Sequence, residues 1–327
     1  MHHEQKPEML RAVVIGGGTG LSVMLRGLKN QPLDLTAIVT VADDGGSSGI
    51  LRSEMQIPPP GDIRNVLMAL ADVEPMLSRL LQYRFTSGNG LAGHSMGNLI
   101  LAAMTDITGD FVTGVRELSK VLAVRGRVLP AAREAVVLKA EMEDGTVVVG
   151  ESQIPLAGGK IRRVFIEPKN PEPLSEAIEA LLQADAIIVG PGSLYTSIMP
   201  NLLVPDIARA VKQSKALKIY VCNIMTQPGE TDHYKVSDHL TAIRNHIGEQ
   251  IFRYVIVHDG EIPVKVLERY AEQGAAAVEV DHEAVASMGC EVISGKLVKF
   301  VQYLRHDEEK LSEQIVRLIQ GWKTKAR

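Results

Sequence analysis

Short apolar runs that end in polar, glycine-bearing segments recur along this chain. Residues 12–15 read Ala-Val-Val-Ile and lead directly into Gly-Gly-Gly-Thr-Gly at 16–20, after which apolar residues return at helical spacing over 21–28. Residues 35–41 form a second apolar run that is rich in β-branched side chains. A strand, a helix and a second strand in this order need a crossover connection, so the pattern predicts a parallel βαβ unit.

The same pattern returns in the second half of the chain. Apolar runs at 186–189 and 218–224 each end in a polar loop, and 254–257 and 276–280 have the composition of two further strands. These runs, with helical segments between them, predict an α/β fold with a mostly parallel sheet. Ligands of such sheets bind at the carboxyl ends of the strands, where the polar loops of this chain are concentrated.

A different period appears between the two halves. Residues 135–142 and 146–153 flank Glu-Asp-Gly, and Asp-Gly between two strands predicts a hairpin. We therefore expect residues 125–170 to form a small antiparallel excursion from a single α/β domain that spans 1–327. Residues 306–327 are predicted to form a C-terminal amphipathic helix. Its apolar side would carry Leu311, Ile315, Leu318, Ile319 and Trp322.

Composition and charge exclude several classes of partner. A formal net charge of -4 and an aromatic content of 4% favour neither phosphate-backbone binding nor base stacking, so we expect no nucleic-acid partner. No apolar run approaches the ~18 residues of a membrane span, and the polar N-terminus is unlike a signal peptide. Two cysteines cannot build a disulfide framework. We therefore expect a cytoplasmic protein with no membrane partner.

The glycine-rich loop after the first strand carries the strongest chemical signal. The first amides of a helix have no partner within the helix, and the helix dipole favours an anion there. Gly17, Gly18, Thr19 and Gly20 would therefore hold a phosphate or diphosphate. The dinucleotide fingerprint G-x-G-x-x-G is incomplete, because Leu21 stands where the third glycine belongs. On this motif alone, a glycine-rich turn without a ligand is the alternative.

Polar residues also follow the second predicted strand. Asp43 and Asp44 lie at its end, where an acid commonly binds a ribose hydroxyl. The Gly-Gly-Ser-Ser-Gly segment that follows contains Ser47. This segment either forms a second anion-binding nest or is simply a flexible turn. The position beside the glycine loop favours a role in binding.

Two more segments place polar residues near the start of a predicted helix. Asp62 has the position of a helix N-cap, which is the larger part of its expected role, while Arg64 and Asn65 in the first turn can reach a ligand at the helix mouth. His94 and Asn98 belong to a third glycine-bounded loop that precedes an apolar helix. A histidine in such a place is either a packed or capping residue or a catalyst.

The later strand ends supply the remaining candidates. Gly192, Ser193 and Thr196 follow the strand at 186–189 and would contact phosphate or sugar. Asn223 and Thr226 follow the next strand. The amides of Asn65, Asn98 and Asn223 would bind hydroxyl groups, since neutral amides and hydroxyls suit a sugar.

Six stretches taken together are more specific than any one loop. They are Gly16–Ser22, Val41–Gly49, Pro58–Asn65, Gly93–Asn98, Gly190–Ser197 and Asn223–Asp232. This set resembles the bacterial gluconeogenesis factor family (YvcK or GlmR), which belongs to the same superfamily as 2-phospho-L-lactate transferase, CofD. The resemblance covers about residues 10–305. It implies a Rossmann-like three-layer α/β/α fold of the CofD type.

The resemblance further implies a cytoplasmic factor required for growth and cell shape, that is for morphogenesis, under gluconeogenic conditions. Members of the family bind UDP-sugars, notably UDP-N-acetylglucosamine, and pockets of this type hold dinucleotides such as NAD. Our leading hypothesis is a regulatory nucleotide-sugar-binding factor that requires no cofactor. It favours a binding role over an enzymatic one, and the enzymatic alternative stays open. We expect a homo-oligomer with a protein partner in cell-wall precursor or central carbon metabolism.

The alternative hypothesis is a magnesium-dependent transferase of a phosphorus-containing group. Asp44, Asp62 and His94 are then the catalytic candidates, with the carboxylates near a Mg²⁺ ion, although no metal site is assigned. The chain departs from the transferases at Gly93–Asn98, where they carry an acid-containing loop, and this puts their activity in doubt. An NAD-dependent oxidoreductase is a weaker third reading, since no proton donor is paired with a hydride site.

Overall fold

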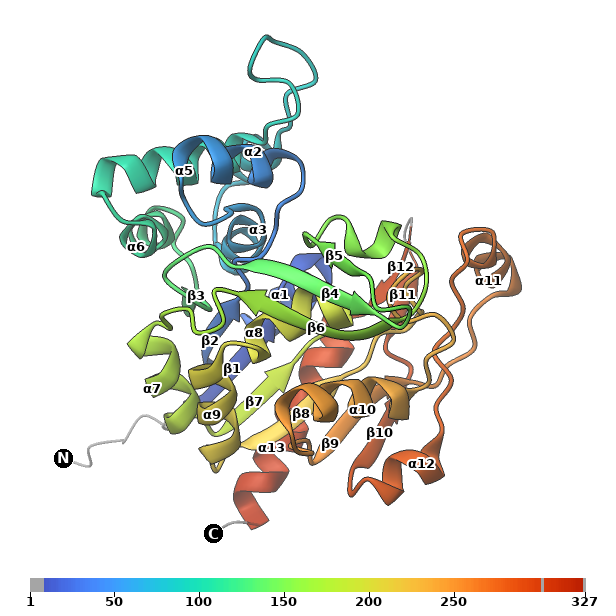
Figure 1. Ribbon diagram of the computed structural model, residues 1–327. Helices are drawn as coiled ribbons and strands as arrows, with labels where there is room; N and C mark the ends of the chain where they lie inside the picture. Colours follow the sequence, from blue (N-terminus) through green and yellow to red (C-terminus); the bar gives the residue numbers. More distant parts are fainter. Residues whose placement is uncertain (1–8, 301–302, 326–327) are drawn as a thin grey trace, which may run out of the picture.

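The computed structural model describes residues 9–300 and 303–325, and a seven-stranded sheet lies at its centre (Figure 1). From edge to edge the strands are β10 (Glu291–Gly295), β9 (Tyr254–His258), β8 (Leu217–Val221), β7 (Ala186–Val189), β1 (Leu10–Gly16), β2 (Leu33–Val39) and β3 (Arg127–Pro130). All neighbouring pairs are parallel, as the alternating pattern predicts. The chain runs outward from β1 in one direction and outward from β7 in the other.

Helices cover both faces of this sheet, because successive residues of each strand point to opposite sides. In β1, Val13 and Ile15 belong to one buried cluster and Ala12 and Val14 to the other. The first cluster includes residues of α7 (Ser175–Gln183), α9 (Pro205–Gln213) and α10 (Val236–Ile247). The second includes residues of α1 (Gly18–Leu28), α3 (Gly61–Leu70) and α13 (Glu308–Lys325). The three-layer fold is confirmed.

A group of helices extends beyond the sheet near β2 and β3 (Figure 1). It consists of α2 (Gly46–Met55), α4 (Pro75–Gln82), α5 (Met96–Thr108) and α6 (Phe111–Val121), and α5 contacts the other three as well as α3. Short elements complete the fold. They are α8 (Met199–Leu202), α11 (Val264–Ala271), α12 (His282–Ser287), a 3₁₀ turn at Ile154–Leu156, a π-helical turn at Leu194–Ile198, and the hairpin of β11 (Val298–Phe300) and β12 (Leu304–His306).

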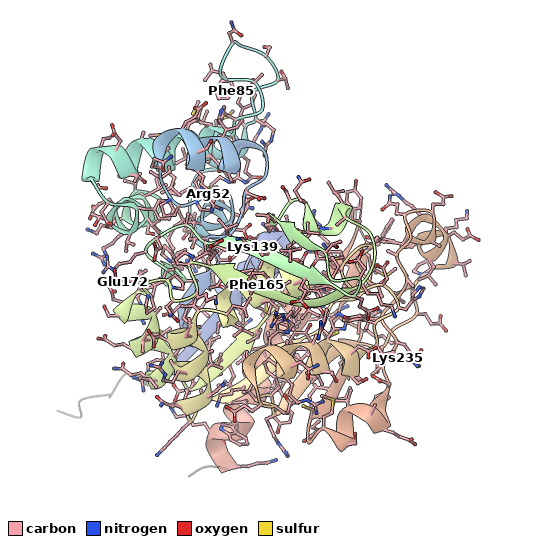
Figure 2. All side chains as sticks on the ribbon, in the orientation of Figure 1. Arg52, Phe85, Lys139, Phe165, Glu172 and Lys235 are labelled. Atoms are coloured by element: carbon pink, nitrogen blue, oxygen red, sulfur yellow. The ribbon has the colours of Figure 1, made fainter. Side chains whose placement is uncertain are left out.

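The antiparallel excursion is a three-stranded sheet of β4 (Val137–Met142), β5 (Val147–Val149) and β6 (Ile161–Glu167). The Glu-Asp-Gly segment joins β4 to β5, so the predicted hairpin is present. Lys139 and Phe165, labelled in Figure 2, are opposite each other across β4 and β6. The predicted start at 125 lies too early, because Arg127–Pro130 pairs with β2 in the main sheet.

Three local expectations differ from the structure. Residues 276–280 form isolated bridges to Met225 and Lys235 instead of a strand, since they run along the edge of the strand-end loops. The segment after Asp44 is helical from Gly46 onward, so the flexible loop is shorter than expected. Asp62 lies inside the first turn of α3, where Pro60 takes the cap position without a side-chain bond.

The C-terminal helix begins at Glu308 and buries Leu311, Ile315 and Ile319 against the second core cluster. The expectation for 306–327 holds over α13, while 326–327, like residues 1–8 of the expected domain, lie outside the described residues. Within the part of the chain that the structure describes, no helix is both long and apolar enough to cross a membrane.

Candidate functional site

Two glycine loops meet where the direction of the sheet reverses. β1 ends at Gly16 and leads into α1, while the adjacent β7 ends at Val189 and leads into a loop that contains Gly190 and Gly192. In open parallel sheets the crevice for a ligand opens outside the strands at this switch point, because the two connections depart to opposite faces. The predicted phosphate loop is therefore located where such a fold binds ligands.

Close packing explains two of the glycines. A Cβ atom on Gly20 would lie 2.9 Å from the carbonyl oxygen of Pro191, so the two loops approach each other through bare backbone. A Cβ atom on Gly17 would lie 2.4 Å from a carboxylate oxygen of Asp62. A side chain at position 20 would therefore push the two backbones apart, whereas one at position 17 would displace the side chains of Asp62 and Thr40. At these two positions glycine is required by the neighbouring protein atoms, before any ligand is considered.

A cavity of about 380 Å³ opens over the two loops, and we call it the glycine-loop pocket. It contains eight predicted residues: Gly17, Gly18, Thr19, Gly20, Gly192, Ser193, Asn223 and Thr226. Its lining has no carboxylate, and Arg305 is its one arginine or lysine within the described chain. Backbone amides, hydroxyls and one guanidinium make this cavity suited to an anionic ligand that also carries hydroxyl groups.

Three predicted residues shape the pocket by holding its walls. The Asn223 side chain donates to the carbonyl oxygen of Gly192 at 2.9 Å and accepts from the Gly192 amide at 3.2 Å. The Thr226 hydroxyl accepts from the Ala276 amide at 2.9 Å. Thr196 is buried and donates to the carboxylate of Glu230 at 2.9 Å, behind the loop. Burial raises the pKa of Glu230 to about 7.

The three predicted acids lie on the other side of the glycine loop, together with Glu151, which the sequence analysis missed. We call Asp43, Asp44, Asp62 and Glu151 the acidic cluster. None of the four lines the glycine-loop pocket. Burial first, and then the charge of Asp43, raise the pKa of Asp62 to about 7. Burial and the neighbouring acids, Asp43 foremost, raise the pKa of Glu151 to about 8. Charged carboxylates repel one another in this region, so protons are retained near neutral pH.

Asp62 connects the acidic cluster to the glycine loop. Its carboxylate accepts hydrogen bonds from the Gly18 amide and the Asn65 side chain. The Gly18 amide, which the sequence analysis expects to bind phosphate, is therefore already hydrogen-bonded to a protein group. Asp43 and Asp44 are similarly engaged, with the Gly45 amide at 2.9 Å and the Ser152 amide at 2.8 Å. The helix-capping role expected for Asp62 is wrong, because its carboxylate is directed at the neighbouring loop.

Ser47, His94 and Asn98 form a buried chain of hydrogen bonds between α2 and α5. The Asn98 amide donates to the Ser47 hydroxyl at 3.1 Å, and the Ser47 hydroxyl lies 3.0 Å from Nδ1 of His94. The Ser47 hydroxyl has two acceptor sites and one donor, so it can accept from Asn98 and also pair with Nδ1 of His94 in either direction. This arrangement holds two helices together and orients His94, the proposed catalytic candidate, from its Nδ1 side.

Arg64 and Asn65 lie in the first turn of α3. The Arg64 guanidinium donates to Ser95 at 2.9 Å and to the Asn65 oxygen at 2.6 Å, and it is largely buried, which lowers its pKa. Asn65 lines a second cavity beside the glycine-loop pocket. In the described ranges, 9–300 and 303–325, no group of three or more histidine, cysteine, aspartate or glutamate side chains has a metal-binding arrangement.

Several pocket residues escape the sequence analysis. Arg305 and His306 come from β12, and Tyr270 comes from α11, which are far from the glycine loop in sequence. His306 is buried with Nε2 unpaired, and burial lowers its pKa to about 4. Nothing local marks these residues, since no glycine loop adjoins them and β12 belongs to a short two-stranded sheet outside the main sheet. Ser197, Ile224, Met225 and Gln227 also line the pocket and fall inside the motif stretches.

The fold and site define a Rossmann-like protein with its ligand pocket at the switch point of a parallel sheet. The family model of 2-phospho-L-lactate transferase CofD matches residues 12–298. The chain is 58% identical to a gluconeogenesis factor of Halalkalibacterium halodurans over 305 residues, covering 93% of this chain and 95% of that relative. The gluconeogenesis factor of Bacillus subtilis is 56% identical over 316 residues, which cover 96% of this chain and 99% of it. The chain belongs to the gluconeogenesis factor family, a branch of the CofD-like proteins.

A solved structure agrees with this assignment. The crystal structure of a member of the UPF0052 family from Bacillus halodurans superimposes with a TM-score of 0.93 at 56% identity, over 95% of this chain and all of that one. The resemblance seen in the sequence motifs is confirmed. Sequence and fold therefore point to the same family over nearly the whole described chain.

Proposed function

We propose that this protein is a cytoplasmic regulatory factor that binds a nucleotide sugar of the UDP-N-acetylglucosamine type in the glycine-loop pocket. The observation that carries the proposal is the lining of that pocket, which combines backbone amides, hydroxyls and Arg305 and, over the described part of the chain, contains no carboxylate. A diphosphate needs donors and positive charge, and a sugar needs matched neutral donors and acceptors. The volume of about 380 Å³ lies within the usual range of small-molecule sites.

The ligand is placed by the two glycine loops. The diphosphate would lie against the backbone amides of Thr19 and Gly20, since the amides of Gly18 and Gly192 are already paired within the protein. Ser193 would be a further donor, and Arg305 would neutralise the diphosphate from the side of β12. A ribose contact with Asp43 or Asp44 would require the nucleoside to extend past the glycine loop, because neither residue lines the pocket. The same pocket would accept a dinucleotide such as NAD, because both ligands share the nucleoside diphosphate.

Isothermal titration calorimetry with UDP-N-acetylglucosamine tests the proposal. We expect Thr19→Val to weaken binding by about 10-fold, since it removes a donor to a charged group. Asp44→Asn tests the ribose contact and should weaken binding by about 3-fold. Thr324→Val, an exposed threonine on α13, is the matched control. Tight binding that ignores both site substitutions would refute this placement of the ligand, and no binding at all would refute the ligand class.

The family names of the relatives support a role in gluconeogenic growth. We propose that the ligand-bound state acts on a protein partner in cell-wall precursor or central carbon metabolism, that the protein is needed for cell shape under these conditions, and that it assembles as a homo-oligomer. Deletion of the gene followed by growth on a gluconeogenic carbon source, with the Thr19→Val and Arg305→Gln alleles as complements, tests the link. Full complementation by both alleles would show that growth on this carbon source does not depend on ligand binding.

A magnesium-dependent transferase is the second candidate, and two observations favour it. The matching family model is that of a transferase, and the acidic cluster contacts the glycine loop through Asp62. Asp44 and Asp62 would hold the ion, which would neutralise charge on the phosphates. Incubation of labelled nucleotide-linked donors with magnesium and a range of acceptors decides the matter. Product that forms with the parent protein and not with Asp62→Asn would establish transferase activity. Absence of product with every donor would favour the regulatory role.

A further inference from the structure

A second cavity of about 540 Å³ lies beside the glycine-loop pocket, and we call it the α1–α4 cavity. Three helices line it along one face each, at helical spacing. These residues are Thr19, Ser22, Arg26 and Lys29 from α1 and its end, Asn65 and Met68 from α3, and Pro75, Ser78 and Gln82 from α4. Arg26, Pro75, Gln82 and Arg305 are exposed, so the cavity is an open groove beside these helices with a largely polar lining, which a ligand can reach from solvent.

The charged side chains that line this cavity are basic. They are Arg26, Lys29 and Arg305, and among the described residues no carboxylate lines it, although Asp72 acts on Lys29 from beside the lining. Lys29 donates to the carbonyl oxygen of Ala71 at 2.6 Å, which fixes its ammonium group at the wall. Arg26 is exposed and Lys29 is half-buried, and desolvation by the surrounding atoms lowers the pKa of both. Three cations around one cavity repel each other, and an anion would relieve that repulsion.

The arginines lack a protein counter-ion. Within residues 9–300 and 303–325, neither Arg26 nor Arg305 forms an ion pair with a carboxylate. Glu308 acts on Arg26 from a distance, but its carboxylate is paired with Lys299. A guanidinium without a partner offers a planar pair of donors that matches a phosphoryl group.

The two cavities share a border. Thr19 and Arg305 line both of them, so a ligand in one cavity lies next to a ligand in the other. The hydroxyl and amide groups of Ser22, Ser78 and Gln82 supply neutral contacts around the cations. That combination suits a small phosphorylated compound with several hydroxyl groups, such as a sugar phosphate.

We propose that the α1–α4 cavity binds a phosphorylated sugar-sized metabolite, separate from the nucleotide sugar, with its phosphoryl group between Arg26 and Arg305. The two ligands compete for Arg305 and bring like charges together, so each weakens the binding of the other. By linkage, the factor by which one ligand weakens the other is the same in both directions. The fraction of protein that carries the nucleotide sugar would then depend on the concentrations of both anionic metabolites.

Calorimetry with glucose 6-phosphate, glucose and inorganic phosphate tests the site itself. We expect glucose 6-phosphate and phosphate to bind and glucose not to bind. Arg26→Gln should weaken the phosphorylated probe by about 10-fold or more, because it removes a charge-assisted contact. The control is Arg79→Gln, which removes an exposed charge from α4 outside the cavity lining and should change binding by less than about 2-fold. Thermal melting establishes that both variants are folded.

The outcomes separate this site from the proposed nucleotide-sugar pocket. No saturable binding of glucose 6-phosphate or phosphate up to about 10 mM would overturn the proposal. Equal effects of Arg26→Gln and Arg79→Gln would overturn it as well, since only a diffuse surface charge would remain. A further outcome is that Arg26→Gln lowers the affinity for UDP-N-acetylglucosamine by the same factor as the affinity for the sugar phosphate. In that outcome the cavity holds part of the nucleotide sugar, and there is no second ligand. Arg26-dependent binding of the sugar phosphate without any nucleotide-sugar binding would support this site while refuting the proposed function.

Discussion

The glycine-loop pocket and the acidic cluster lie on opposite sides of one short loop and have opposite chemistry. The pocket is lined by amides, hydroxyls and Arg305, whereas the cluster holds four carboxylates, two of which retain protons near neutral pH. Each region contains residues that follow a strand of the main sheet, β1 for the glycine loop and β2 for Asp43 and Asp44. Asp62 comes from the start of α3, and Glu151 follows β5 of the antiparallel sheet. A residue at the carboxyl edge of the sheet can therefore contribute to a site. Its position at that edge does not determine whether its side chain faces the pocket or the acidic cluster.

Asp62 is the link between the two regions. Its carboxylate accepts from the Gly18 amide, and Gly17 has no side chain because that carboxylate occupies the space. The glycine loop is therefore held by Asp62 on the side of the acidic cluster, and its other side faces the pocket. An anion that binds in the pocket meets a loop whose shape is already set by the protein, which lowers the entropic cost of binding.

The largest expected effect comes from forcing the two glycine loops apart. In Gly20→Ala the new Cβ atom would lie 2.9 Å from the Pro191 carbonyl oxygen, so the backbone must shift. We expect the free energy of unfolding to fall by about 2 kcal/mol and nucleotide-sugar binding to be lost. Urea unfolding and calorimetry measure both. Gly321→Ala is the control, because open space surrounds it in α13, and it should raise stability by about 0.5 kcal/mol. Similar results for the two variants would contradict the close contact of the loops.

Removing the charge from the pocket should affect binding without affecting the acidic cluster. Arg305→Gln is expected to weaken UDP-N-acetylglucosamine by about 10-fold to 100-fold, because a charge-assisted contact to the diphosphate is lost. Its side chain is exposed, so stability should be unchanged. Arg317→Gln on α13, far from the pocket lining, should bind like the parent protein. Equal affinity of Arg305→Gln and the parent would show that the diphosphate lies elsewhere.

A substitution away from the pocket lining should lower stability and leave ligand binding nearly unchanged. Ser47→Ala leaves the Asn98 amide and Nδ1 of His94 without their buried partner, which should lower the free energy of unfolding by about 1–2 kcal/mol. Nucleotide-sugar binding by the folded protein should change by less than about 2-fold, since the pocket lining is intact. The exposed Ser53→Ala in the same helix is the control. A large loss of affinity in Ser47→Ala would mean that the two regions act as one site.

The acidic cluster should also give stability a pH dependence of definite sign. The pKa of Glu151 rises from 4.5 to about 8 and that of Asp62 from 3.8 to about 7, so the folded protein binds protons that the unfolded chain releases. The contribution of these groups is then most favourable at low pH, and the free energy of unfolding falls as pH rises from about 5 to about 8.

Glu151→Gln isolates that effect. It should match the parent at pH ~5 and exceed it by roughly 1 kcal/mol at pH ~8, because the neutral amide has no charge to bury. Chemical denaturation at several pH values measures the difference. The exposed Glu54→Gln on α2 should leave the pH dependence unchanged. A parent protein whose stability rises over this range would contradict the raised pKa values.

Much of the fold follows from the sequence because local signals agree with it. The apolar run at 186–189 coincides with β7, and the Asp-Gly turn marks the hairpin between β4 and β5. Residues 276–280 have the composition of a strand, yet they lie beside the strand-end loops and form only isolated bridges. Their place beyond the sheet edge is a property of the whole fold, so local composition could not reveal it.

The sequence by itself determined that the glycine loop starts a helix at the end of a buried strand, since glycine spacing and apolar period are local properties. It also determined the family, because six motif stretches occur in order. The tertiary structure alone decided which polar residues face the pocket. Asp62 and Thr19 are both near glycine in sequence, but only Thr19 lines the cavity, while Arg305 arrives from β12 almost 300 residues away. Side-chain direction and strand order set these contacts, and neither is encoded within one loop.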